Sequence, residues 1–556
     1  MPPPIAPEAP RRYALRGRLV TMDPRNTVLP DGVLYVHDGL IEDLRPASDP
    51  PPPGYEGLAR TASGGSVYPG LIELHNHLPY DVLQLWQVPK RFTNRSQWGG
   101  TEAYRRLVTG PMTVLGHDPL LMPAVVRYVE AKALVNGTTT SQGIALFSNA
   151  GARRMYRGVV RNVEQPQDPA LPAAASRIAD VDAADARRFL DRISRSQRVL
   201  LHLAEGVSTD TAARAHFLAL QYEPGTPGKW AITENLIGIH CTALTAADFD
   251  ILADHGGSMV WSPLSNLLLY GQTADIAAAK RAGVRSGLGS DWSVSGSKGL
   301  LGELKAARLA SAAAGDVHSD RELVAMATSD AAAMLRWGGS LGTLQPGKRA
   351  DLLAVSGTGG DPYAGLIDAG DDDIRLVVID GTARYGTTGL MHALAPGALL
   401  EKALPGRLVN LDDEQSDPLV AGLTLAEATA RLTAALGELP ARAAPGAPLH
   451  ALALPEEEPT WHLALDEIQP TGAELRPRLP VRGAAGAFAG GPVIRSRSAA
   501  PAALTALTLD ALTAGQDAGF LTTLAAEANL PEMLGTRLAE LLAGGSRPGP
   551  ARRVGT

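Results

Sequence analysis

Two histidines stand one residue apart at the end of an apolar segment. The stretch "YPGLIELHNHLPYD" (68–81) contains "LIELHNH", which predicts a short buried strand that ends in His75 and His77. Side chains two residues apart in a strand leave the same face of the sheet. Two imidazoles in this arrangement indicate a metal site, and its other ligands must then come from other strand ends that the fold brings together.

Three further polar residues follow apolar runs in the same way. His202 lies in "LLHLAE", His240 in "IGIHC" and Asp291 in "GLGSDW". Burying each of these groups without a partner would cost about 1–3 kcal/mol, whereas one shared cation satisfies them together. Neutral imidazoles and a carboxylate are a good ligand set for one divalent ion, Zn²⁺ first and Fe²⁺ as the alternative.

The elements that must position these residues alternate between strands and Ala-rich amphipathic segments. Expected strands fall at 71–77, 137–143, 198–205, 236–244, 258–266 and 284–292. This α/β alternation favours a parallel sheet closed into a (β/α)8 TIM-like barrel over 67–337, where catalytic groups project from the carboxyl ends of the strands. An open doubly wound sheet is the alternative, but no Gly-rich phosphate fingerprint follows the first strand.

Other segments flank this barrel. Residues 1–10 are Pro-rich and are expected to be disordered. Short strands in 11–66 and 338–390 are expected to pair in one composite β-sandwich, which would bring the two ends of the barrel segment close together. The Ala-, Leu- and Pro-rich C-terminal extension, 391–556, shows helical patterns but no chemical motif, so we expect a packing or oligomerisation element.

The overall composition narrows the class of protein. Of 556 residues, 45% are hydrophobic and 20% charged, a usual globular balance. The net charge of −7 argues against a nucleic-acid partner. A single cysteine, Cys241, excludes an internal disulfide framework and fits a reducing cytoplasm. No apolar run reaches the roughly 18 residues that a membrane span needs. These features predict a soluble cytoplasmic protein that acts on a small molecule.

The motifs together resemble the amidohydrolase superfamily, in the branch of cytosine deaminase, methylthioadenosine/S-adenosylhomocysteine deaminase and the triazine chlorohydrolases. The residues that carry the resemblance are "PGLIELHNH" (69–77), "HLAE" (202–205), "IGIHCTAL" (237–244), "WSPLSN" (261–266), "GLGSDW" (287–292) and "LGTLQPGKRADLLAV" (341–355). The resemblance covers roughly residues 12–390 and leaves 391–556 outside it.

The resemblance implies roles for the polar residues. Ligands of one metal would be His75, His77, His202 and Asp291. Glu205 would move a proton from water to the leaving group, His240 would polarise the substrate, and Asp291 could also accept a proton. Two-metal relatives use a lysine on the fourth strand. Because Lys132 in "EAKALVNG" is expected to be helical, a mononuclear centre is favoured.

The implied reaction is attack of metal-activated hydroxide on an sp² carbon, which breaks a non-peptide C–N bond. Deamination of a small heterocycle is the favoured interpretation of this reaction. The alternatives are hydrolysis of a cyclic or linear amide or of a C–Cl bond, or a catalytically silent scaffold that uses 391–556 for interaction. A homodimer through barrel helices is the expectation that the resemblance gives.

A long insertion, "LPYDVLQLWQVPKRFTNRSQWGGTEAYRRL", follows the first strand. In a barrel enzyme this loop overhangs the active site, so it is expected to close over an aromatic or anionic substrate. A solvated charged loop or a dimer contact is the alternative. The expected substrate contacts, with helix capping or core packing as the alternatives for the last three, are Trp86, Arg91, Arg95, Trp98, Ser262, Asn266 and Trp292.

Overall fold

The computed structural model describes residues 12–148, 152–166, 168–177, 186–195, 198–223, 228–444, 460–465, 503–531 and 533–544. The expected disordered segment, 1–10, lies outside these residues. At the centre are eight short strands that pair in parallel in two sheets. The first sheet contains β5 (Leu71–Ile72), β6 (Thr138–Ser141) and β9 (Arg161–Asn162); the second contains β10 (Ala175–Arg177), β11 (Val199–Leu203), β14 (Leu236–His240), β15 (Ser258–Trp261) and β16 (Ser286–Leu288).

Backbone hydrogen bonds span both gaps between these two sheets. Ala174 N donates to Val163 O at 2.8 Å between the segments of β9 and β10. On the other side, Asp291 N donates to His75 O at 3.1 Å and His77 N donates to Asp291 O at 2.6 Å. A continuous ladder that closes the barrel is not recorded among the described residues. The predicted parallel α/β arrangement is therefore present, but closure of its strands into a barrel is not seen among the described residues.

Strands β11, β14 and β15 are buried along their whole length because helices cover the sheet, as is usual for parallel strands. Capping residues set several helix starts: at α6, Thr245 and Asp248 form a reciprocal capping box. The helices of this part are α3 (Met122–Val135), α4 (Ala186–Arg195), α5 (Thr211–Leu218), α6 (Ala246–Asp254), α7 (Pro263–Tyr270), α8 (Ile276–Ala282), α9 (Leu300–Ala313), α10 (Asp320–Met326) and α11 (Ser329–Met334).

The insertion after β5 is built of short helical turns. Its elements are η1 (Leu78–Val82), η2 (Arg95–Gln97), α1 (Glu102–Tyr104), the π-helical η3 (Arg105–Thr109) and α2 (Gly110–His117). Small strand pairs lie beside the sheets: β7 (Ala145–Ser148) with β8 (Arg153–Met155), and β12 (Gln221–Glu223) with β13 (Lys229–Trp230).

Strands from before and after the barrel segment share one nine-stranded sheet. Strand β4 pairs in parallel with β1 and antiparallel with β17. The composite sandwich stays a prediction, because the described strands form one continuous sheet and no second facing sheet is recorded among them. In order across the sheet the strands are β20 (Leu400–Leu404), β21 (Arg407–Asn410), β19 (Thr382–Thr387), β18 (Ile374–Ile379), β17 (Leu352–Ser356), β4 (Arg60–Pro69), β1 (Arg12–Val20), β2 (Val28–His37) and β3 (Leu40–Pro46).

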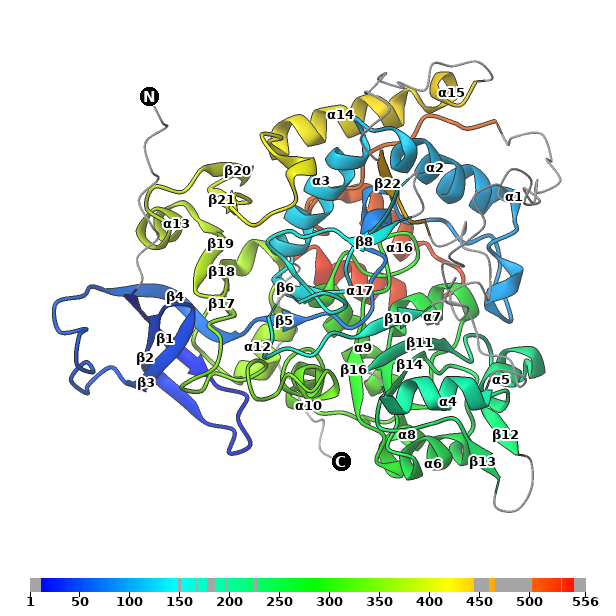
Figure 1. Ribbon diagram of the computed structural model, residues 1–556, viewed down its shortest axis with the longest axis horizontal. Helices are drawn as coiled ribbons and strands as arrows, with labels where there is room; N and C mark the ends of the chain where they lie inside the picture. The colour runs from blue at the N-terminus through cyan, green and yellow to red at the C-terminus, as the bar shows by residue number, and fades with distance from the viewer. Residues whose placement is uncertain are drawn as a thin grey trace, which may run out of the picture.

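The described part of the C-terminal extension packs against the barrel segment. Figure 1 shows α14 lying along α3 and α17 near α9, and α16 packs on α17. Strand β22 pairs antiparallel with β7. Across the described residues, no helix has the length and apolar character to cross a bilayer. Elements of this part and of its approach are α12 (Pro362–Asp368), η4 (Asp371–Asp373), α13 (Thr388–Leu394), η5 (Pro418–Val420), α14 (Leu425–Gly437), α15 (Leu439–Arg442), β22 (Trp461–Leu463), α16 (Ala518–Ala525) and α17 (Leu534–Leu542).

Candidate metal centre

Four histidines and two carboxylates gather at the carboxyl ends of the parallel strands. His75 and His77 follow β5, His202 lies near the end of β11, His240 ends β14 and Asp291 follows β16. These strands are neighbours or are joined by backbone hydrogen bonds, so residues far apart in the chain meet at one rim. This rim is the end of a parallel α/β fold at which functional side chains gather.

The distances between these groups are those of a compact ligand set. His75 Nε2 lies 3.1 Å and His77 Nε2 3.4 Å from Asp291 Oδ1. The ring centroids of His75 and His202 are 4.7 Å apart. One ligand atom each from His75, His77 and His202 lies within 4.8 Å of the others, and so does the set of His75, His240 and Asp291.

The protonation of His75 fits a metal ligand. Its Nδ1 lies 3.0 Å from Gln142 Oε1, which also accepts from the backbone N–H of Asn76 at 3.1 Å. Because that oxygen is an acceptor, Nδ1 carries the proton and the lone pair is on Nε2. Nε2 is buried and has no hydrogen-bond partner among the described residues. A buried lone pair aimed at other imidazoles and a carboxylate is what a divalent cation requires.

A chain of hydrogen bonds supports Gln142 from behind. Gln142 Nε2 donates to Ser176 Oγ at 2.8 Å, and Ser176 Oγ donates to Glu164 Oε1 at 2.5 Å. The other oxygen of Glu164 accepts from Gly143 N at 2.8 Å. Gln142 is the last residue but one of the segment "GTTTSQG" (137–143) that the sequence predicts as a strand, and the sequence does not single it out. A polar side chain one residue after a fully buried strand was the available signal.

Burial sets the charge state of the imidazoles. It lowers the pKa of His202 well below its usual range, helped by the neighbouring imidazoles. Burial also lowers the pKa of His240 to about 3. For Asp291, burial acts to raise the pKa, but attraction to His75, His240 and His77 overrides it and lowers the pKa. Neutral imidazoles around an ionised carboxylate are the forms that bind Zn²⁺.

Helix α7 holds the far side of the centre through two side chains. Ser265 Oγ donates to Asp291 Oδ2 at 2.6 Å. Asn266 Nδ2 donates to His240 Nδ1 at 3.0 Å, so the proton of His240 is on Nε2, which faces Glu205. Ser262 is the N-cap residue of α7, but its side chain makes no capping bond and its buried Oγ has no partner among the described residues.

The carboxyl group of Glu205 lies close to three polar side chains, those of Tyr270, His240 and Arg95. Tyr270 O–H donates to its Oε1 at 2.6 Å. Its Oε2 lies 3.8 Å from His240 Nε2 and 3.9 Å from Arg95 Nε. Burial raises the pKa of Glu205, and Arg95 opposes this rise. A carboxyl group with a raised pKa can both take and return a proton near neutral pH.

Three aromatic side chains, which we call the aromatic wall, lie on the side of His77: Tyr80, Trp98 and Trp292. The Trp292 ring centroid lies 5.2 Å from those of His77 and Tyr80. Trp98 lies 6.0 Å from Trp292, and its Nε1 donates to Tyr270 Oη at 3.0 Å. The sequence singles out both tryptophans but misses Tyr80 and Tyr270, which are unremarkable in their local context.

Two other expected substrate contacts lie elsewhere, as does the lysine that the sequence singled out. Trp86 packs at 5.6 Å on Tyr104, one layer behind the wall. Arg91 Nε donates to Asn529 O at 3.0 Å, so this guanidinium holds the C-terminal segment. Lys132 lies in α3, as its context predicts, and its Nζ donates to Asp81 O at 2.7 Å rather than joining the ligand atoms.

The backbone around the centre is strained. Ala204, His240, Cys241 and Asp291 all have left-handed φ angles, between 50° and 70°. For residues other than glycine such conformations cost about 1–3 kcal/mol each and persist where the surrounding structure enforces them. Because these conformations are concentrated beside the ligands, the surrounding structure must stabilise them, and they set the directions of these side chains.

The fold and this group of side chains define a candidate metal centre at the carboxyl ends of parallel α/β strands. Residues 198–384 of the chain match the model of the amidohydrolase family. A 5-methylthioadenosine/S-adenosylhomocysteine deaminase from Symbiobacterium thermophilum is 25% identical over 418 residues, which cover 66% of this chain and 92% of that protein.

Two solved structures are similar in fold. A triazine hydrolase variant is 20% identical, with coverage of 76% of this chain and 99% of that chain and a TM-score of 0.51. A mutant of atrazine chlorohydrolase from Arthrobacter aurescens TC1, complexed with zinc and atraton, is 19% identical, with coverage of 76% and 99% and a TM-score of 0.50.

Proposed function

We propose that this protein deaminates a small planar nitrogen heterocycle, with zinc as the preferred ion. As an amidohydrolase it acts on carbon–nitrogen bonds other than peptide bonds, and its relative from Symbiobacterium thermophilum is named a deaminase. One observation carries the proposal for this chain. The ligand atoms of His75, His77 and His202 converge, as do those of His75, His240 and Asp291, with Glu205 beside His240. This arrangement supports proton transfer by Glu205 and polarisation by His240.

A divalent ion held by the three imidazoles and Asp291 would supply Lewis acidity and make a water molecule more acidic. Glu205 takes a proton from the attacking water and delivers it to the leaving nitrogen, since its burial favours a protonated intermediate state. The water oxygen bonds to the sp² carbon and the C–N bond breaks. One water proton leaves with the nitrogen as ammonia, and the other stays on the hydroxy or oxo product.

His240 stabilises the charge that develops on the substrate. Its Nε2–H points into the centre because Asn266 occupies Nδ1, so it donates to the ring nitrogen or oxygen that gains electron density. Asp291 stays ionised and is held by Ser265, which keeps one oxygen directed at His75 and His77.

The substrate enters on the side of His77 and Arg95. Their side chains are 13% and 20% exposed, whereas those of Asp291 and Glu205 are 5% exposed. A planar ring entering here meets Trp292 and Trp98, whose faces suit stacking. Arg95 supplies a guanidinium beside this entry, which favours a substrate with an anionic or carbonyl group.

The test combines metal analysis with product identification. Zinc-loaded protein is expected to hold about one equivalent of zinc per chain and to release ammonia from an amino-substituted heterocycle, with products scored by mass. His75→Ala is expected to lose both properties, and His255→Ala, an exposed histidine at the end of α6, to keep both. A new carboxylate without ammonia, release of chloride, or zinc binding without any turnover would each replace the deaminase proposal.

A further inference from the structure

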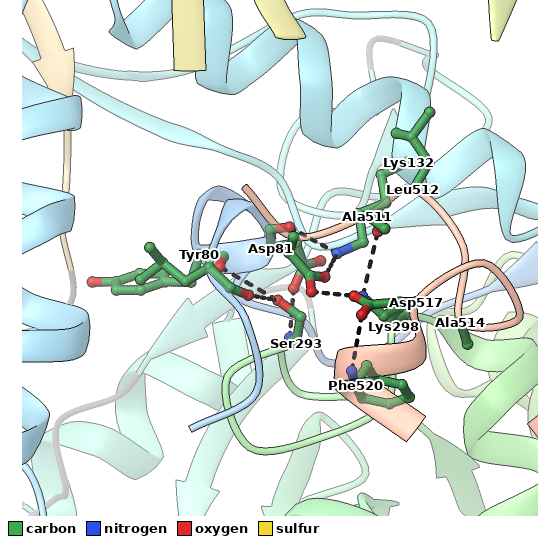
Figure 2. A network of polar contacts seen from close by, with 12 residues as sticks. Tyr80, Asp81, Lys132, Ser293, Lys298, Ala511, Leu512, Ala514, Asp517 and Phe520 are labelled. Carbon is green, nitrogen blue, oxygen red and sulfur yellow. Dashed lines mark hydrogen bonds and ion pairs between the residues drawn. The ribbon is translucent and has the colours of Figure 1, made fainter. Parts of the chain in front are cut away.

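The described residues 503–531 and 533–544, which we call the C-terminal clasp, lie outside the segment that matches the amidohydrolase model. Figure 2 shows where the clasp meets the barrel segment. Asp510 is fully buried there. Its Oδ1 accepts from Lys298 Nζ at 2.6 Å and its Oδ2 from Lys132 Nζ. Lys298 Nζ also contacts Asp517 Oδ2 at 2.9 Å. One carboxylate from the clasp thus pairs with two buried lysines of the barrel segment.

Each of the two lysines is connected with a different loop of the site. Lys132 projects from α3 and its Nζ donates to the carbonyl of Asp81, in the loop that follows His77. Lys298 lies in the loop that follows Asp291. Ser293 N of that second loop donates to Asp81 Oδ1 at 2.7 Å. Asp510 N itself donates to Val82 O at 3.0 Å.

Further contacts extend the clasp along the same rim. Asn136 Nδ2 donates to Leu512 O at 3.0 Å. Asn529 accepts from Arg91 and donates through Nδ2 to Leu268 O of α7 at 2.9 Å. Helix α17 packs on α9, where Leu542 lies against Gly302. The clasp therefore touches the loop after the first strand, α7 and α9. The loop follows His75 and His77, α7 carries Ser265 and Asn266, and α9 follows Asp291 in the chain.

The tied loops carry two members of the aromatic wall. Tyr80 precedes Asp81 directly, and Trp292 precedes Ser293 directly. Their ring centroids are 5.2 Å apart, and Trp292 is equally close to His77. Any movement that separates the two loops would separate these rings.

We propose that Asp510 is a positioning residue of the metal centre: through Lys132 and Lys298 it joins the loop after His77 to the loop after Asp291 and so fixes Tyr80 and Trp292 as a preformed face for a planar substrate. The substrate part of this inference rests on the proposed function. The clasp is an in-chain structural element of the active site, supplied from outside the family domain. Asp510 contacts no reacting atom and acts through the two lysines.

The test compares Asp510→Asn with Glu540→Gln, an exposed residue of the same clasp that pairs only with Arg537 among the described contacts. Hydrogen exchange of the full-length, zinc-loaded protein is read at the amides of 80–86 and 292–298. Asp510→Asn is expected to accelerate exchange there at least tenfold while leaving the amides of β14 unchanged, and Glu540→Gln to change neither.

A kinetic readout separates positioning from mere stability. Asp510→Asn is expected to raise KM for the planar substrate about tenfold, with a smaller fall in kcat and about one equivalent of zinc retained. If Asp510→Asn does not fold, Lys298→Met, which leaves Asp510 paired with Lys132, is measured in the same way. Unchanged exchange in both loops, or exchange that rises equally in β14 with KM unaltered, overturns the proposal. Because exchange needs no substrate, it decides the matter even if no heterocycle is turned over.

Discussion

Gln142 Oε1 accepts a hydrogen bond from His75 Nδ1 at 3.0 Å and thereby directs the lone pair of Nε2 toward the other ligand atoms. A hydrogen bond to the remote nitrogen of a metal-binding histidine fixes both its tautomer and its orientation. The ring is therefore prepared for an ion before any ion arrives. The first prediction follows from this contact.

Gln142→Leu should weaken zinc binding by about 10–100-fold, the usual effect of losing such a partner. His75 Nδ1 would then have no acceptor in a buried site, and the ring would rotate or change tautomer. Competition with a calibrated zinc chelator measures the change. Gln415→Leu, at an exposed loop position, is the control and should leave zinc affinity unaltered. Equal affinities for Gln142→Leu and the unmodified chain would contradict this assignment.

Tyr270→Phe should move the acidic limb of the pH–rate profile to higher pH. Tyr270 O–H donates to Glu205 and favours its ionised form, so its removal raises the pKa of Glu205 above the already raised value. More alkaline conditions are then needed to generate the base form. We also expect kcat/KM to fall at least about tenfold, as for the loss of a hydrogen bond to a charged group. Tyr363→Phe on α12 should leave the profile in place, and an unshifted limb in Tyr270→Phe would remove Glu205 from the proton-transfer role.

Glu303→Gln should flatten the dependence of stability on pH. Burial raises the pKa of Glu303 to about 8 although Leu264 N and Ser297 Oγ donate to it. Between its unfolded value near 4.5 and about 8 the folded state holds the extra proton, so the free energy of unfolding falls as pH rises through this window. Glutamine keeps acceptor capacity without titrating. Relative to the unmodified chain, we expect the variant to gain at least about 2 °C in Tm on going from pH 5 to pH 9.

The control for Glu303 is Glu322, a carboxyl group whose pKa is shifted in the opposite direction. Hydrogen bonds from Ser319 and the pairing with Lys280 override burial and lower the pKa of Glu322 to about 2. Its contribution is complete above its unfolded value near 4.5 and is lost only as pH falls below that value. Glu322→Gln should therefore lower Tm by a constant amount from pH 5 to pH 9. A pH-dependent difference for Glu322→Gln, or none for Glu303→Gln, would refute the linkage.

Arg95→Gln should discriminate between substrates by charge. Arg95 lies beside Glu205 at the entry, whereas Arg105 in the same insertion donates, among the described residues, to backbone carbonyls such as that of Gly100. We expect Arg95→Gln to raise KM at least about tenfold for a heterocycle that bears a carboxylate and to change KM little for a neutral one, because the loss concerns a charge-assisted contact. Arg105→Gln should change neither. Steady-state kinetics on a matched pair of substrates gives the answer, and an equal effect on both would assign Arg95 to the active-site scaffold.

The sequence predicts the site better than its surroundings, for a physical reason. His202 and His240 each interrupt an apolar run, and a polar group at the end of a buried strand leaves a local signature that can be read without a structure. Tyr270 and Asn529 act through partners that are distant in sequence, and nothing in their neighbours marks them. Gln142 also acts through a distant partner, and its place directly after a buried strand was its local signal. Arg91 illustrates the limit: its charge and place in the insertion suggest a substrate contact, but its guanidinium binds the clasp.

The fold, like the site, could be predicted from the sequence only in part. Alternation of strands and helices predicts the parallel sheets because each element must bury its own apolar face. The nine-stranded sheet depends on β4 meeting β17 across a long separation, so hydrophobic patterns indicate the strands but not their partners. The extension after residue 391 looks featureless because Asp510 gains its meaning only from Lys132 and Lys298.

The pairing of Asp510 has a consequence for biosynthesis. A ribosome completes every candidate ligand of the metal by residue 291, but the carboxylate that neutralises Lys298 emerges 212 residues after that lysine, and 378 residues after Lys132. Until then the nascent chain must keep two ammonium groups hydrated or paired in another way, so the contacts of Asp510 at the rim form only after residue 510 has been made. A message cut short before codon 510 therefore yields a chain with every candidate ligand but without the carboxylate that pairs with Lys132 and Lys298.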